Sequence, residues 1–391
     1  MKKFVPELDG LRGFGMLVLL TAHFPIYLVE YNWVLINGFF IMSGFLISRI
    51  LLDEKNKKGT IAEKFKVYWF RRMLRIFPPY YLYLAVVSIL FLFFSFPRDY
   101  SDYIVKLLTF TFNLGTEFTN KSEIATLTVH LWSLSVEEQF YLVLPLIIFA
   151  VSLRSLKYII LFFILFSPAF RYLLGEYQLK HLGAVRGITI YWHTLSYLDA
   201  FFMGVGINVF NMTQWKLKKW HLVLAVCLFI AAGLINSRTG MGEFEWSYYI
   251  INLGYVLGET MNYQHVWSYS IINIFFCILI ALLAANSGDN KSRLHRFFRF
   301  KPLAFLGSVS YSVYVYHLAI LVLFRKLITP QVMYGSNMSK FLFFLLYLGV
   351  MYLIGYLSFR FFESRFLKMK PKYLQVPSIE HPVKINKKKI K

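Results

Sequence analysis

Residues 11–24 read LRGFGMLVLLTAHF, an apolar segment that contains two ionisable side chains, Arg12 and His23. Eleven residues at ~100° each make about three turns of an α-helix, so both side chains are predicted on one helix face, roughly 16 Å apart along the axis. Ionisable residues inside a membrane span are costly and are functional candidates by default. The segment therefore predicts a transmembrane helix whose polar face can link the two sides of a membrane.

The composition of the whole chain is typical of a polytopic membrane protein. Of its 391 residues, 58% are hydrophobic and only 16% are charged, and the mean hydropathy is +0.54. A soluble chain of this length needs more charge to cover its surface. No cleavable signal peptide is expected, because the first apolar run is long and lacks a small-residue cleavage site. We predict an all-α integral membrane protein with about ten transmembrane helices and cytoplasmic N- and C-termini, the spans being 11–30, 33–52, 77–96, 134–152, 157–174, 189–210, 220–236, 269–286, 303–325 and 340–362.

The distribution of basic residues sets the predicted orientation. The net charge of +22 is compatible with nucleic-acid binding, but 32 of the 42 Lys and Arg residues fall in stretches that this topology places inside. That asymmetry is the positive-inside pattern of membrane proteins, so no nucleic-acid partner is expected. An eleventh apolar stretch, 246–260, would invert the basic loop 287–302, and we expect it in an outer loop. Residues 1–366 are predicted to form one membrane domain, and residues 367–391 a basic, disordered cytoplasmic tail attracted to anionic lipid.

Three arginines precede the third predicted span, in the segment YWFRRMLRIFPPYYLY. Arg71, Arg72 and Arg75 fall at positions i, i+1 and i+4, so Arg71 and Arg75 are predicted on one helix face. They are compatible with a positive-inside anchor of snorkelling side chains. They are equally compatible with an anion site, because paired guanidinium groups bind phosphate with a fork geometry that lysine lacks. The second interpretation predicts a phosphorylated cytoplasmic ligand.

A second set of polar residues is predicted in the outer half of the spans. Side chains of this type are unusual in lipid-facing positions, so we expect them to face one polar cavity. A histidine oriented by a carboxylate is the usual means of removing a proton from a hydroxyl group, although a structural role remains open for each residue taken alone. The chain has no HExxH, CxxC, Walker or GxSxG motif. The members of this set are His23, Glu137, Glu138, Arg171, Asp199 and His317.

At these residues the chain resembles the membrane acyltransferase-3 family, whose members O-acetylate bacterial cell-surface and secreted glycans. The resemblance covers nearly the whole chain, and several motifs occurring in order make it specific. The matching segments are LDGLRGFGMLVLLTAHF, NGFFIMSGFLISRIL, FRRMLRIFPPYYL, HLWSLSVEEQFYLVLPLI, LDAFFMGVGI, FLGSVSYSVYVYHLAI and FRFFESRF.

The resemblance implies ten spans in the bacterial cytoplasmic membrane, an acyl-CoA donor inside, usually acetyl-CoA, and a carbohydrate acceptor outside. Many relatives carry an extracytoplasmic SGNH esterase-like domain, which we do not expect after residue 366. No tightly bound cofactor or metal is implied. The roles carried over are Arg12 and His23 as paired essential residues; Arg71, Arg72 and Arg75 as donor-binding; Glu137 as the acidic residue of WSLxxE; and Ser310 with His317 in the late SYSVYVYH segment.

These observations lead to the hypothesis of a membrane O-acyltransferase. His23 is the expected general base, with Glu137 orienting it, although a covalent acyl-histidine relay is also compatible with the sequence. Arg171, Asp199, Ser310 and His317 are candidate acceptor contacts. A transporter for a glycan or lipid-linked intermediate is the alternative from another class, and a membrane sensor without chemistry is a third. The acyl group, the acceptor and the oligomeric state are left open by the sequence.

Overall fold

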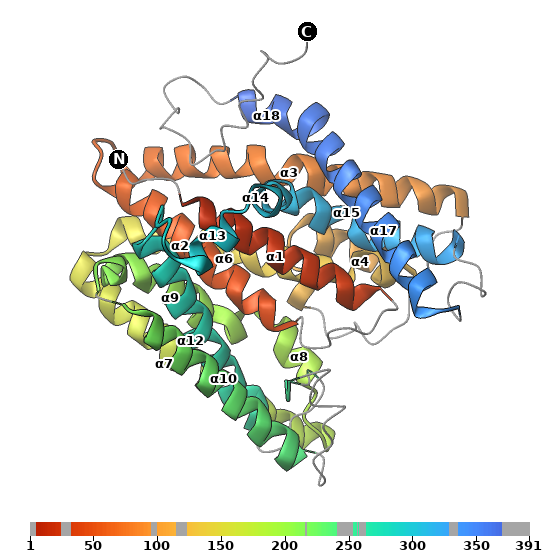
Figure 1. Cartoon of the computed structure of the whole chain (residues 1–391). Helices are drawn as coiled ribbons and strands as arrows, with labels where there is room; N and C mark the ends of the chain where they lie inside the picture. Colours follow the sequence, from red (N-terminus) through yellow and green to blue (C-terminus); the bar gives the residue numbers. More distant parts are fainter. Residues whose placement is uncertain are drawn as a thin grey trace.

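The computed structural model describes residues 5–24, 33–94, 100–114, 123–215, 217–240, 253–255, 257, 263–327 and 335–369. Within these ranges every regular element is helical, as predicted (Figure 1). The elements are α1 (Pro6–His23), α2 (Val34–Lys55), α3 (Ile61–Phe94), α4 (Tyr100–Leu108), η2 (Phe112–Leu114), α5 (Glu123–Thr128), η3 (Val129–Leu131), α6 (Trp132–Ala150), α7 (Leu153–Leu182), α8 (Gly187–Trp192), η4 (Thr194–Tyr197), α9 (Leu198–Val209), η5 (Met212–Gln214), α10 (Lys219–Gly240), α12 (Gln264–Ala285), α13 (Arg293–Phe298), α14 (Lys301–Ser308), α15 (Ser310–Leu327), α17 (Asn337–Leu357), η7 (Ser358–Glu363) and α18 (Ser364–Lys368).

Seven helical stretches in the described part of the chain are long and apolar enough to cross a membrane. Helices α14 and α15 give an eighth if the pair, bent by 70°, forms one broken span. These eight regions coincide with eight of the ten predicted spans, which confirms the helical membrane class. The predicted span 189–210 is instead divided into α8, η4 and α9. Helix α1, in the predicted span 11–30, is not among these eight regions, because its first half contains the charged residues Glu7, Asp9 and Arg12. Ten spans with cytoplasmic termini therefore remain a prediction.

Helix α3 differs from the sequence-based expectation. The predicted span began at residue 77, after the arginines, but α3 is one continuous helix that contains both the arginines and the Pro78–Pro79 pair (Figure 1). Proline removes a backbone donor and usually ends a helix. In membrane proteins, however, neighbouring helices and side chains can satisfy the carbonyl groups that are freed. The carbonyls that lose their helical partner are those of Leu74 and Arg75, four residues before each proline. Close to them, the Ile76 carbonyl oxygen accepts a hydrogen bond of 2.9 Å from the Tyr311 hydroxyl of α15.

Glycines allow two helix pairs to approach closely. A Cβ atom on Gly307 of α14 would lie 1.8 Å from the Asp9 carbonyl oxygen of α1, and one on Gly13 would lie 2.1 Å from the Leu303 carbonyl oxygen. Between α2 and α9, a Cβ on Gly204 would lie 2.0 Å from the Ile41 carbonyl oxygen. Small residues at such contacts are how membrane helices gain packing energy. These contacts fix how α1 and α2 are rotated against their neighbours.

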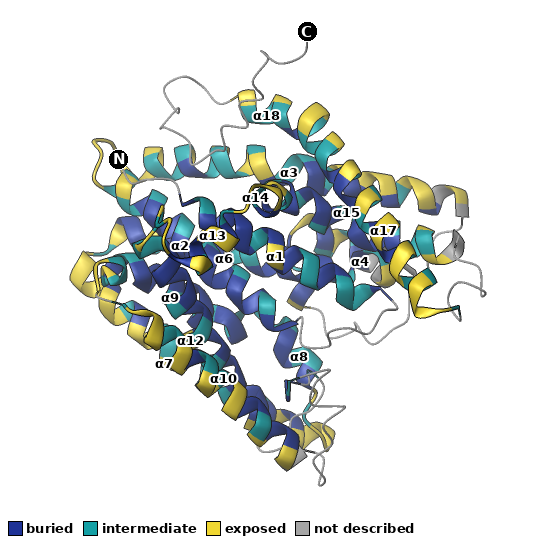
Figure 2. Cartoon of the chain, in the orientation of Figure 1, coloured by how far each residue is buried: buried dark blue, intermediate teal, exposed yellow. Residues whose placement is uncertain are grey.

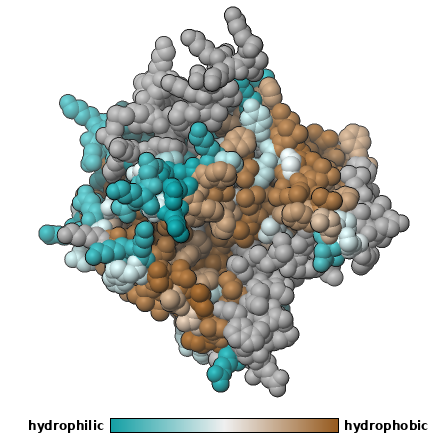
Figure 3. Space-filling view, in the orientation of Figure 1, coloured by the Kyte–Doolittle hydropathy of each residue, from teal (hydrophilic) through white to brown (hydrophobic). Residues whose placement is uncertain are grey.

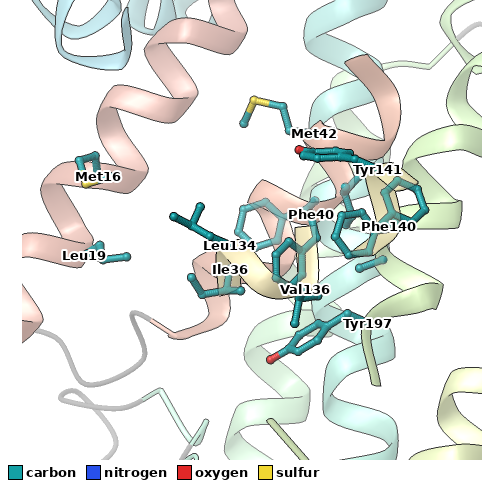
Figure 4. Packing of buried hydrophobic residues seen from close by; sticks show 14 of the residues in the cluster. Met16, Leu19, Ile36, Phe40, Met42, Leu134, Val136, Phe140, Tyr141 and Tyr197 are labelled. Carbon is teal, nitrogen blue, oxygen red and sulfur yellow. The ribbon is translucent and has the colours of Figure 1, made fainter. Parts of the chain in front are cut away.

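Buried residues gather toward the middle of the bundle (Figure 2), and stacked aromatic rings are part of this packing (Figure 4). The ring centroids of Phe140 and Phe201 are 4.0 Å apart, and those of Phe40 and Phe201 are 4.6 Å apart. Phe40 also meets Tyr197 edge to face at 4.8 Å. Stacked and edge-to-face pairs add to the energy of burial, so they hold α2, α6 and α9 together.

Large apolar side chains are also exposed on the outside of the bundle. Phe162, Leu165 and Leu173 of α7 and Val223 and Ile235 of α10 are all more than half exposed. Figure 3 shows apolar residues over much of one face, with hydrophilic side chains gathered on the left of the view. An exposed apolar surface of this extent suits contact with lipid. The stretch 246–260 and the tail 367–391 lie almost entirely outside the described residues.

Candidate active site

Helix α1 positions both residues singled out by the sequence. Arg12 lies in its second turn and His23 is its last residue, so the helix separates them by three turns. Arg12 Nη1 lies 3.1 Å from Asp9 Oδ1, one turn earlier on the same helix. The carbonyl oxygen of His23 accepts a 2.8 Å hydrogen bond from Arg325 Nη2 of α15. Each end of α1 therefore carries its own polar group.

A charged cluster forms where α1, α3 and α6 meet. It consists of Arg12, Arg72, Arg75, Glu137 and Glu138, which we call the charged cluster. Arg75 interacts electrostatically with Arg12 and Arg72, and Arg72 interacts with both glutamates. Arg75 has an exposed side chain, whereas Glu138 is only 5% exposed. Arg75 is therefore the most exposed cation of the cluster.

Arg72 is held by its neighbours on α6. Its Cζ atom lies 3.8 Å from the centroid of the Tyr141 ring, a cation–π contact. Its Nε atom is buried and has no hydrogen-bond partner among the described residues. Arg71 instead interacts with Glu54 at the end of α2. The structure thus groups Arg72 with Arg75, three residues apart, where the sequence favoured Arg71 with Arg75.

Glu137 belongs to this cluster and not to the histidines. Its Oε1 atom accepts a 2.7 Å hydrogen bond from the Ser43 hydroxyl of α2, and its electrostatic partners include Arg72 and Arg12. The partners of Glu137 thus lie on α2, α3 and α1, and none of them is a member of the histidine pair that the sequence predicted, so an orienting role toward His23 stays a prediction. Glu137 is the sixth residue of α6, about one and a half turns from its start.

A second group consists of His23, His130 and His317, which we call the histidine cluster. The ring centroids of His23 and His317 are 5.2 Å apart, and those of His130 and His317 are 4.7 Å apart. The rings come from α1, from η3 and from α15. His317 is fully buried and His130 is 4% exposed, while His23 is partly accessible. The sequence analysis identified two of these three rings and missed His130.

The hydrogen bonds of the two buried rings define which nitrogens carry protons. His317 Nδ1 lies 2.6 Å from the Tyr314 carbonyl oxygen, and His130 Nε2 lies 3.0 Å from the Val315 carbonyl oxygen. A carbonyl can only accept, so both of these nitrogens donate. In the neutral rings the other nitrogens, His317 Nε2 and His130 Nδ1, carry lone pairs. Both atoms are buried without a hydrogen-bond partner among the described residues.

The tyrosine beside the histidine cluster fixes its backbone. The Tyr314 hydroxyl donates to the His130 carbonyl oxygen at 2.7 Å and lies 2.5 Å from the Ser133 hydroxyl. Through these bonds α15 is tied to the turn that precedes α6. The positions of His130 and His317 are therefore coupled.

Arg171 and Asp199 form a separate buried ion pair between α7 and α9. Arg171 Nη2 donates to Asp199 Oδ2 at 2.9 Å, and the two side chains are 0% and 1% exposed. Arg171 also donates to the carbonyl oxygens of Ser196 and Val266, at 2.5 and 3.1 Å, and lies over the Tyr269 ring. This burial leaves no accessible surface for a substrate. The described partners of Arg171 and Asp199 do not include the histidines, and a contact of these two residues with an acceptor stays a prediction.

Ser310 lies at the bend between α14 and α15. Its hydroxyl donates to the Gly307 carbonyl oxygen at 2.8 Å. This bond joins the last turn of α14 to the first residue of α15 across the bend. It is two helical turns from His317 on the same helix. The structure thus gives Ser310 a local partner at the bend rather than a place beside the histidine cluster.

Three ionisable residues in or beside the two clusters were not predicted as site residues from the sequence. They are His130, Arg325 and Glu363. Glu363 ends a π-helical segment and accepts hydrogen bonds from the hydroxyls of Ser312 and Ser358, at 2.5 and 2.9 Å. It also interacts electrostatically with Arg75. The signal for His130 and Glu363 was available, since both stand in quoted motifs, HLWSL and FRFFESRF, as ionisable residues beside apolar ones.

The chain was compared with known proteins. The family described as "Acyltransferase domain" matches residues 5–360. The peptidoglycan O-acetyltransferase OatA of Listeria monocytogenes serovar 1/2a is 25% identical over 379 residues, which are 93% of this chain and 56% of the relative. A putative O-acetyltransferase of Staphylococcus aureus (strain COL) is 23% identical, over 94% of this chain and 58% of the relative. O-acetyltransferase OatA of Staphylococcus aureus (strain NCTC 8325 / PS 47) is 25% identical, over 82% and 51%.

The chain thus spans about half the length of the curated relatives it matches. No solved structure matches it. The family match, in contrast, extends over nearly all of the chain and includes both polar clusters. The chain belongs to the acyltransferase-3 family of membrane proteins.

Proposed function

We propose that this protein is a membrane-bound O-acyltransferase. It transfers an acyl group, acetyl in the first instance, from acyl-CoA at the cytoplasmic face to a hydroxyl of a carbohydrate outside. The observation that carries the proposal is that α1 joins the charged cluster, through Arg12, to the histidine cluster, through His23. Eleven residues of α-helix span roughly 16 Å. A long flexible donor anchored at one cluster can thus present its thioester toward the other.

The donor is proposed to bind at the charged cluster. Coenzyme A carries phosphates, and arginine binds phosphate in a bidentate manner. Arg75 is suited to this role because its side chain is exposed. The positive charge of Arg72 is offset by two glutamates, and its guanidinium lies over the Tyr141 ring. We therefore assign Arg72 to holding the charged cluster together, and Arg75 and Arg71 to contacting phosphate. Residues 1–366 form the catalytic domain in this proposal.

His23 is the proposed general base. Its ring is partly accessible and lies at the end of α1 opposite the charged cluster. A ring nitrogen of His23 removes the proton of the acceptor hydroxyl while the oxygen bonds to the acyl carbon. The carbon–sulfur bond then breaks, and the same proton passes to the thiolate of CoA. Two relatives bear the name O-acetyltransferase OatA, one of them acting on peptidoglycan, which supports a glycan hydroxyl as acceptor.

The test follows radiolabel from acetyl-CoA in inside-out membrane vesicles prepared from the source cells. Vesicles that contain the chain are compared with vesicles that lack it. We expect alkali-labile label inside the vesicles only when the chain is present, because an ester has formed on the far side of the membrane. Equal labelling of the two preparations, with the chain correctly inserted, would contradict the proposal.

We expect Arg75→Ala to raise the KM for acetyl-CoA by about 10- to 100-fold, the effect of losing a hydrogen bond to a charged group. The turnover number at saturating donor should change little. Initial rates of label transfer are measured against acetyl-CoA concentration. The matched control is Arg154→Ala, an exposed arginine near the start of α7, which should leave the KM unchanged. A lowered turnover number with unchanged KM for Arg75→Ala would remove Arg75 from the donor site.

A further inference from the structure

We propose that His317 and His130 are positioning residues for His23, in the place where sequence reasoning put a carboxylate. His317 accepts the ring N–H of His23 that faces it, and His130 holds His317. The inference rests on the proposed function, because it assigns a purpose to the histidine cluster in acyl transfer.

The ring of His317 carries a free lone pair on the nitrogen that does not donate to Tyr314. His317 donates from Nδ1 to Tyr314, so its Nε2 atom is left as an acceptor. This atom is buried and has no partner among the described residues. The ring of His23 is 5.2 Å away between centroids, a separation that a rotation of the His23 side chain can convert into an N–H···N hydrogen bond. Catalytic hydrogen bonds often tighten in this way only when substrate is bound.

Burying the nitrogen atoms of the histidine cluster without partners costs free energy. A buried polar atom without a partner is unfavourable by about 1–3 kcal/mol. The histidine cluster contains two such atoms, His317 Nε2 and His130 Nδ1. An apolar side chain would fill either position without this cost. Unsatisfied buried groups in a folded protein call for a functional explanation. Here one belongs to the ring that contacts the proposed base, and the other belongs to the ring that contacts His317 in turn.

The proposed reaction creates a positive charge on His23. When His23 takes the proton of the acceptor hydroxyl, it becomes a cation beside Arg325, whose guanidinium is bonded to the His23 backbone. Among the residues that the structure describes, the charged group acting on His23 is Arg325, and no carboxylate there offsets that charge. The lone pair of His317 Nε2 can accept a hydrogen bond from the new imidazolium and delocalise its charge while the thiolate departs. His317 thereby orients His23, so that the other ring nitrogen of His23 faces the acceptor.

The position of His317 depends in turn on His130. The His130 ring meets the His317 ring edge-on, with centroids 4.7 Å apart and an interplanar angle of 77°. The His130 ring is itself anchored by the Val315 carbonyl and by the Tyr314 hydroxyl bound to its backbone. His317 therefore cannot tilt away from His23 without displacing His130.

Two substitutions at His317 separate positioning from packing. In His317→Asn, the amide N–H can still donate to the Tyr314 carbonyl, but no acceptor remains at the Nε2 position. In His317→Gln, the amide oxygen reaches the Nε2 position. Label transfer from acetyl-CoA is measured in inside-out vesicles, together with the thermal unfolding of each purified variant. The exposed His181 of α7 provides the control substitution, His181→Asn.

We expect His317→Asn to lower the turnover number by about 10- to 100-fold, with the KM for acetyl-CoA and the unfolding temperature unchanged. His317→Gln should recover a large part of that loss. His130→Gln keeps a donor toward Val315 and should lower the turnover number by a smaller factor. His181→Asn should behave as the native chain.

Native turnover in stable His317→Asn would overturn the inference while leaving the proposed function intact. If His317→Asn fails to fold, the decision rests on His317→Gln and His130→Gln, and native turnover in both would overturn it. Absence of label transfer by the native chain would instead contradict the proposed function itself.

Discussion

Replacement of His23 by alanine is expected to reduce acyl transfer by about 10²- to 10⁴-fold, the usual contribution of a general base. The fold should persist, because the contact of His23 with Arg325 is made by the backbone carbonyl oxygen, which alanine retains. The His23 ring is also only partly buried, so its removal leaves a small defect. A large loss of activity without a loss of folded protein is the signature of a catalytic group.

Rates of label transfer from acetyl-CoA are compared in vesicles with matched amounts of inserted native chain and His23→Ala. His181→Ala, on an exposed position of α7, is the control for the loss of an imidazole and should retain full activity. The KM for acetyl-CoA should be unaffected by His23→Ala, since the charged cluster is intact. Activity of His23→Ala close to that of the native chain would exclude His23 as the base.

The second large effect is expected at the buried ion pair of Arg171 and Asp199. Asp199→Ala should lower the free energy of unfolding by about 3–5 kcal/mol, because it leaves the Arg171 guanidinium as an uncompensated charge in a fully buried site. The substitution also removes the side-chain bond between Arg171 of α7 and Asp199 of α9, while the bond from the backbone N–H of residue 199 to the Ser167 hydroxyl is retained. Inactivity of this variant would therefore follow from lost folded protein, and not from a lost contact with substrate.

The effect is measured by thermal unfolding: the purified chain is heated, and the fraction that stays monodisperse is determined at each temperature. The control is the double variant Arg171→Met with Asp199→Leu, which removes both charges and should recover much of the lost stability, as apolar replacement of buried pairs commonly does. Normal stability with lost acyl transfer in Asp199→Ala would contradict the structural role and return Asp199 to the list of acceptor contacts.

Much of the fold was predictable because it depends on local patterns. Apolar runs of membrane-spanning length identified eight of the regions that the structure describes as spans, and the spacing of Arg12 and His23 placed both on α1. The motifs also identified the family. The ends of the elements were less predictable: α3 continues through Pro78 and Pro79, although proline usually ends a helix and the pair therefore predicted a boundary.

The candidate site was only partly predictable. Polar residues were predicted to share a cavity from their similar depth along the spans. This criterion placed Glu137, His23 and Arg171 in one group. The structure separates these residues into the charged cluster, the histidine cluster and the buried ion pair. Depth along a span cannot distinguish these groups, because residues at similar depth on different helices can point in different directions.

The sequence by itself determined the membrane class, the family and the residues that share a face of each helix, since the 3.6-residue repeat is a property of a single segment. Only the tertiary structure decided which polar faces meet. The rotation of one helix against another depends on contacts between distant segments, such as Gly13 and Gly307 against the backbones of α14 and α1, or Gly204 against α2. The packed structure brings the ring of His23 beside His317 and Glu137 near Arg72, and no pattern within a single segment specifies either pairing.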